Sequence, residues 1–116
     1  TTSAGVVLTV HGSFDASAAG SFAWASDKIA SHGVTSVART GQGEYTVTFA
    51  NAFDSANYTV ICDAGSQDRS GVSASPRVCT CIARTTTTMD IVVELSDSAG
   101  NVDEAYIAFI VVGTLA

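Results

Sequence analysis

The chain has 116 residues, of which 47% are hydrophobic and 14% are charged, and its formal net charge is −6. This composition excludes intrinsic disorder, and the length suffices for one domain with its own core. The basic residues do not cluster, so the sequence predicts neither nucleic-acid binding nor docking to an anionic membrane; they are Lys28, Arg39, Arg69, Arg77 and Arg84. The longest apolar run, residues 105–112, is far shorter than the roughly 20 residues of a membrane-spanning helix, so membrane insertion is not expected.

The residue types favour strands. Val, Ile and Thr together number 34, whereas Leu numbers 3, Glu 3 and Lys 1. β-Branched side chains lose rotamer freedom in a helix and pack well on a pleated sheet, so we expect an all-β domain. The sparse charge also indicates that something other than water covers part of the surface.

The first half of the chain is expected to hold three strands. The first spans residues 5–12, and a Ser-, Ala- and Gly-rich loop follows at residues 13–21. The apolar segment 22–25 is expected to enter the core, and Trp24 is favoured as a core residue over a sugar-stacking surface. Residues 34–40 and 44–50 then form a hairpin around Gly41-Gln42-Gly43, because glycine supplies the positive φ of such turns.

In the second arm of this hairpin, Tyr45, Val47 and Phe49 alternate with Thr46 and Thr48, which predicts a half-buried strand with its aromatic face inward.

The second half is expected to hold four more strands. The first covers residues 58–64 and leads into a polar loop at residues 65–76, whose length indicates a functional role. Residues 77–85 and 88–95 form a second hairpin. The last strand, residues 104–113, does not alternate and is apolar on both faces.

A strand that is apolar on both faces must be covered on both. The opposing sheet covers one face, and we expect a neighbouring subunit to cover the other. We assign the subunit interface to Ile107, Phe109 and Val111, which stand opposite Tyr106, Ala108 and Ile110. The pattern itself does not decide which of the two sets faces the neighbour.

Seven or eight short strands with regular spacing predict one domain, residues 1–116, built as an antiparallel β-sandwich that is jelly-roll-like or Ig-like.

No motif in the chain indicates catalysis, so no enzymatic activity is expected, and no catalytic or cofactor-binding residue is predicted. His11 and His32 lie in or beside strands and are interpreted as structural. Asp97, Asn101, Asp103 and Glu104 gather oxygens in one loop, but their order is not that of an EF-hand. An Asx-rich turn is favoured there over a weak calcium site, so no metal site is predicted.

The three cysteines, Cys62, Cys79 and Cys81, lack the spacing of a zinc site or a disulfide framework. Free thiols are favoured. A bridge from Cys62 is the alternative, and the sequence does not decide whether it would pair with Cys79 or Cys81.

Residues 22–58 resemble a small β domain found at the C-termini of bacteriophage tail-fibre and related virion proteins. The resemblance is carried by F-A-W-A at residues 22–25, I-A-S-H-G-V-T-S-V-A-R-T-G-Q-G-E-Y-T-V-T-F at 29–49 and A-F-D-S-A-N-Y at 52–58. The matching positions are Trp24, Ile29, Val34, Val37, Gly41, Gly43, Tyr45, Val47, Phe49, Ala56, Asn57 and Tyr58. The chain departs from the family at Ala25-Ser26 and at His32, where the family often has Asn.

The resemblance implies a virion structural protein: a homotrimeric tail-fibre, head-fibre or capsid-decoration module that is made in the host bacterial cytoplasm. Its expected partners are copies of itself, other virion proteins and a glycan or protein of the host surface. We assign host contact to the loop segment Ser66, Gln67, Asp68, Arg69 and Ser70. The alternative function is a carbohydrate-binding module without catalysis.

Overall fold

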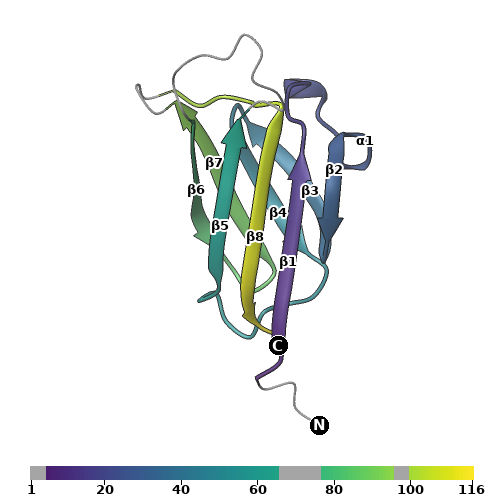
Figure 1. The fold of residues 1–116 in the computed structure, drawn as a ribbon, viewed down its shortest axis with the longest axis vertical. Helices are drawn as coiled ribbons and strands as arrows, with labels where there is room; N and C mark the ends of the chain where they lie inside the picture. The colour runs from purple at the N-terminus through teal and green to yellow at the C-terminus, as the bar shows by residue number, and fades with distance from the viewer. Residues whose placement is uncertain (1–4, 66–76, 96–99) are drawn as a thin grey trace.

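The computed structural model describes residues 5–65, 77–95 and 100–116. Two four-stranded antiparallel sheets pack face to face (Figure 1), which confirms the predicted β-sandwich. The strands are β1 (Val7–Phe14), β2 (Lys28–His32), β3 (Val34–Gly41), β4 (Glu44–Phe49), β5 (Thr59–Gly65), β6 (Arg77–Arg84), β7 (Thr88–Leu95) and β8 (Tyr106–Thr114). A 3-10 turn at Ala19–Ser21 and a one-turn helix, α1 (Trp24–Asp27), lie between β1 and β2.

The first sheet has the strand order β2-β1-β8-β5 and faces the viewer in Figure 1. The second sheet lies behind it and has the order β3-β4-β7-β6. The first strand of the chain pairs with the last, with Val10 opposite Val111. β8 is therefore a central strand, with β1 on one side and β5 on the other.

The core fills the space between the two sheets. Tyr45, Val47 and Phe49 on β4 are all buried, as their alternation predicts. Two aromatic clusters occupy the ends of the sandwich. Phe14, Phe22, Trp24 and Tyr45 form one cluster, in which the centroids of contacting rings lie 5.1–6.2 Å apart. Phe49, Phe53 and Tyr58 form the other, in which they lie 4.7–5.5 Å apart. Within the described residues, no helix has the length and apolar character that crossing a membrane requires.

The β3–β4 hairpin turns at Gln42 and Gly43, because β3 continues through Gly41 and pairs it with Glu44. The loop is thus one residue shorter than predicted. Gly43 has φ +67°, and a Cβ there would lie 2.6 Å from the carbonyl oxygen of Val93. Glycine is required here both by the backbone conformation and by the close approach of β7.

Replacing Gly43 by Ala is expected to destabilise the fold by about 2–4 kcal/mol, because it combines backbone strain with a steric clash. The free energy of unfolding, measured by urea denaturation, tests this. Gly20→Ala is the matched control, since a methyl group there would have no atom within 4 Å and the φ of Gly20 is not positive. Equal stability of the two variants would contradict the role given to Gly43.

Candidate functional site

The candidate site is the outer face of the first sheet, formed by the β1, β8 and β5 side chains that point away from the second sheet. Strand side chains alternate between faces. On β8 the alternation places Ile107, Phe109 and Val111 inward, with 0–2% of their surface exposed. The outer face therefore consists of Val7, Thr9, His11, Ser13, Thr59, Ile61, Asp63, Tyr106, Ala108, Ile110, Val112 and Thr114.

This arrangement corrects the predicted subunit interface. Ile107, Phe109 and Val111 belong to the core of their own sandwich, where they are shielded from any neighbour. The opposite set, which includes Ala108, Ile110 and Val112, is the one presented to the surface. The physical reason is the register with β1, where Gly12 stands opposite Phe109 and leaves room for its ring inside the sandwich.

An apolar and aromatic row crosses the middle of the outer face. Ile110 on β8 stands opposite Ile61 on β5 and opposite His11 on β1, and His11 stands opposite His32 on β2. The two imidazole rings stack, with centroids 5.9 Å apart and an angle of 19° between their planes. Ile61 and Ile110 are 67% and 48% exposed, so the row presents large apolar groups to its surroundings.

A shallow depression lies between β5 and β8 on this side of the molecule. It is lined by Ile61, Cys62, Asp63, Ala108, Phe109 and Ile110. Asp63 is the only charged residue among the outward positions of β1, β5 and β8. Such a surface makes few hydrogen bonds with water, and contiguous exposed apolar groups mark contact sites in folded proteins.

The outer side of the second sheet carries more acidic side chains. Its central strands β4 and β7 present Glu44, Asp90, Val92 and Glu94 outward among threonines, and its edge strand β6 exposes Val78 and Ile82. Thr46 Oγ1 donates a hydrogen bond of 2.7 Å to Asp90 Oδ1 across these strands. Acidic side chains thus gather on this side, whereas the outward positions of β1, β5 and β8 carry a single carboxylate.

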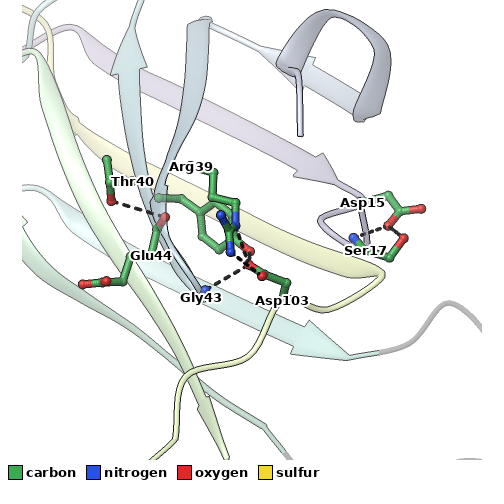
Figure 2. Close-up of polar contacts among 8 residues, drawn as sticks. Asp15, Ser17, Arg39, Thr40, Gly43, Glu44 and Asp103 are labelled. Atoms are coloured by element: carbon green, nitrogen blue, oxygen red, sulfur yellow. Dashed lines mark hydrogen bonds and ion pairs between the residues drawn. The ribbon is translucent and has the colours of Figure 1, made fainter. Parts of the chain in front are cut away.

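A cluster of hydrogen bonds at the end of the sandwich, the polar clasp, holds the segment that leads into β8 (Figure 2). Its members are Arg39, Gly43, Tyr45 and Asp103. Asp103 accepts hydrogen bonds from Arg39 Nε at 3.2 Å, from Arg39 Nη2 at 2.9 Å and from the Gly43 backbone N–H at 2.9 Å. The Tyr45 hydroxyl donates a further hydrogen bond to the same carboxylate. Glu104, the next residue, pairs with Arg77 on β6 at 2.5 Å. These contacts fix the point from which β8 enters the sheet.

The clasp shifts the pKa of its members. Burial would raise the pKa of Asp103, but hydrogen bonds from Arg39, Tyr45 and Gly43 outweigh it and lower that pKa. Burial and the bond to Asp103 raise the pKa of Tyr45. Both Asp103 and Glu104 are thus engaged by arginines. Asp97, which was predicted to share this loop, lies outside the described residues. Among the described residues, no group of three or more His, Cys, Asp or Glu is arranged to hold a metal ion.

The free energy of unfolding is expected to fall as the pH drops through the folded-state pKa of Asp103. This pKa lies below its ordinary value of 3.8, so the stabilisation is present above about pH 5 and is lost on acidification. Urea denaturation between pH 7 and pH 2 measures it in the wild type and in Asp103→Asn. The stability difference between the two should shrink toward zero at low pH. A difference that is independent of pH would contradict this.

Trp24 is half-buried and packs against the core, as expected. Its ring meets Phe14 edge to face at 6.2 Å, and Lys28 Nζ lies 5.9 Å from its centroid. These contacts engage the indole within the protein and do not favour sugar stacking. The predicted host-contact segment, Ser66, Gln67, Asp68, Arg69 and Ser70, lies outside the described residues.

Comparison with family models, curated proteins and solved structures found no match to this chain. The outer face and its chemistry are therefore the basis for a functional proposal. Its apolar row was not evident from the sequence, because it joins residues of four strands whose register only the fold defines.

Proposed function

We propose that this chain is a structural module of a bacteriophage virion that assembles as a homotrimer through the outer face of its first sheet. The observation that carries the proposal is the apolar row of that face, with Ile110 and Ile61 at its centre. The resemblance of residues 22–58 to phage tail-fibre domains supports the place on the virion and the number of subunits.

The distribution of charge supports a second copy of the chain as the occupant of this face. Each copy has a net charge of −6, and copies that approached through their second sheets would bring Glu44, Asp90 and Glu94 together. Like charges that face each other across an interface are unfavourable. Copies that meet through their first sheets bring one carboxylate each, that of Asp63, into the contact from strands β1, β5 and β8.

The role is structural and not catalytic in this proposal. His11 and His32 pack ring to ring on the outer face, where they extend the apolar row across the sheet edge. The module would contact its own copies and other virion proteins, and it would reach a host glycan or protein through its loops.

The native mass of the purified chain tests the assembly. Light scattering after size exclusion, over a dilution series, is expected to give the mass of three chains of 11.8 kDa. A monomer at every concentration would overturn the proposed trimer. The place on the virion has its own test, which is mass spectrometry of phage particles purified from the strain that encodes this sequence. Absence of the chain from washed particles would overturn that part.

A further inference from the structure

The edge where β5 and β6 meet holds a pair of thiols that come from different sheets. β5 is the edge strand of the first sheet and β6 is the edge strand of the second, so no ladder of backbone hydrogen bonds joins them. The two strands nonetheless approach closely, with residue pairs within 8 Å of each other, Cα to Cα. Figure 1 shows both at the same side of the sandwich.

Cys62 on β5 and Cys79 on β6 point toward each other across this edge. Both are partly buried and pack against the core. The two thiols interact, which lowers the pKa of Cys62 and raises the pKa of Cys79. Cys81 shares the inward face of β6 with Cys79, because residues two apart in a strand lie on one side. Its thiol is directed to the carbonyl of Ala83 at 3.6 Å instead.

The position of the two cysteines on neighbouring edge strands suits a disulfide. A disulfide needs Cα atoms within roughly 4.4–6.8 Å and side chains aimed at each other. Cys62 and Cys79 both face inward on neighbouring edge strands that come within 8 Å of each other, Cα to Cα, so an adjustment of these strands can bring the two sulfurs together. The strands involved are edges, each held by a ladder on one side only, so they can make this adjustment more easily than central strands.

We propose that Cys62 and Cys79 form an intramolecular disulfide that fastens the two sheets together at the β5–β6 edge. The oxidant is a small disulfide such as oxidised glutathione. The Cys62 thiolate attacks one sulfur of it and expels one glutathione thiolate, which leaves a mixed disulfide on Cys62. The Cys79 thiolate then attacks the Cys62 sulfur and expels the second glutathione. The two cysteines lose two protons and two electrons, and the oxidant is reduced to two thiols.

The environment of the two sulfurs fits this order of events. The interaction with Cys79 lowers the pKa of the Cys62 thiol, whereas the interaction with Cys62, together with burial, raises the pKa of Cys79. Cys62 is therefore the attacking thiolate, and Cys79 resolves the mixed disulfide.

Tryptic mapping after incubation with oxidised glutathione tests the pairing. Cleavage at arginine places Cys62 in the peptide of residues 40–69, and places Cys79 and Cys81 in the peptide of residues 78–84. The Cys81→Ser variant keeps the proposed pair. It should give the two peptides linked to each other, with an intact mass lower by two hydrogens and no titratable thiol left. Its thermal midpoint should rise by on the order of 10 °C, and dithiothreitol should reverse the rise.

Cys79→Ser is the matched control, because it keeps Cys62 and Cys81. It should give glutathione adducts and little linked peptide. Linkage in Cys79→Ser as efficient as in Cys81→Ser would overturn the choice of Cys79. Glutathione adducts without linkage in a folded Cys81→Ser variant would overturn the disulfide itself. Neither result depends on the oligomeric state, so failure here is distinct from failure of the proposed trimer.

Discussion

Replacing Ile110 by Asp is expected to convert the trimer into a folded monomer. Ile110 lies at the centre of the outer face, on a central strand, and is 48% exposed in the single chain. In the proposed assembly the new carboxylate would be buried between copies without a partner. Such burial costs several kcal/mol, which raises the dissociation constant by on the order of 100-fold or more. Light scattering measures the mass, and circular dichroism shows whether the strands persist.

Val78→Asp is the matched control for this variant. Val78 is 47% exposed and points outward from β6, in the second sheet, so the two substitutions introduce the same charge at nearly equal exposure. The two variants differ in which sheet carries the new charge. Val78→Asp should remain trimeric. If both variants dissociate, or neither does, the contact does not lie on the outer face of the first sheet.

Replacing Phe109 by Ala is expected to destabilise the fold by about 3–5 kcal/mol, although Phe109 is the neighbour of Ile110 in the chain. Phe109 is 2% exposed, and its ring packs over Gly12 of β1, where a Cβ would come within 2.6 Å of the ring. Truncation leaves a cavity between the sheets. A domain of this kind has a total stability of about 5–15 kcal/mol, so the loss is a large part of it.

The measurement is made in the Ile110→Asp background, so that subunit association does not contribute to the free energy of unfolding. Val112→Ala in the same background is the control, because Val112 is on the same strand, points outward and is 39% exposed. It should cost less than about 1 kcal/mol. Equal losses for the two variants would contradict the assignment of Phe109 to the core.

Much of the fold was accessible from the sequence. The strict alternation of β4 identifies its inward side chains without further information, because polar threonines separate the apolar residues. β8 offers no such contrast, since its residues are apolar on both faces. Its inward set is decided by the register with β1, where Gly12 makes room for Phe109, and that register is a tertiary property.

The candidate site was less accessible. Asp103 could be interpreted as a turn residue, but its partner Arg39 lies 64 positions away. Cys79 and Cys81 share the inward face of β6, because residues two apart in a strand lie on one side. That Cys62 faces Cys79 depends on β5 and β6 belonging to different sheets, which no local pattern encodes.

The most direct test of the outer face as the contact between copies is the solvent exposure of the isoleucine methyl groups in the native assembly. Methyl NMR with a soluble paramagnetic probe reads them individually. Ile61 and Ile110 lie on the outer face at 67% and 48% exposure, Ile82 lies on β6 at 60%, and Ile91 and Ile107 are fully buried. In the assembly, Ile61 and Ile110 should be as protected as Ile91 and Ile107, while Ile82 is strongly quenched. Quenching of Ile61 and Ile110 to the level of Ile82 would contradict the account.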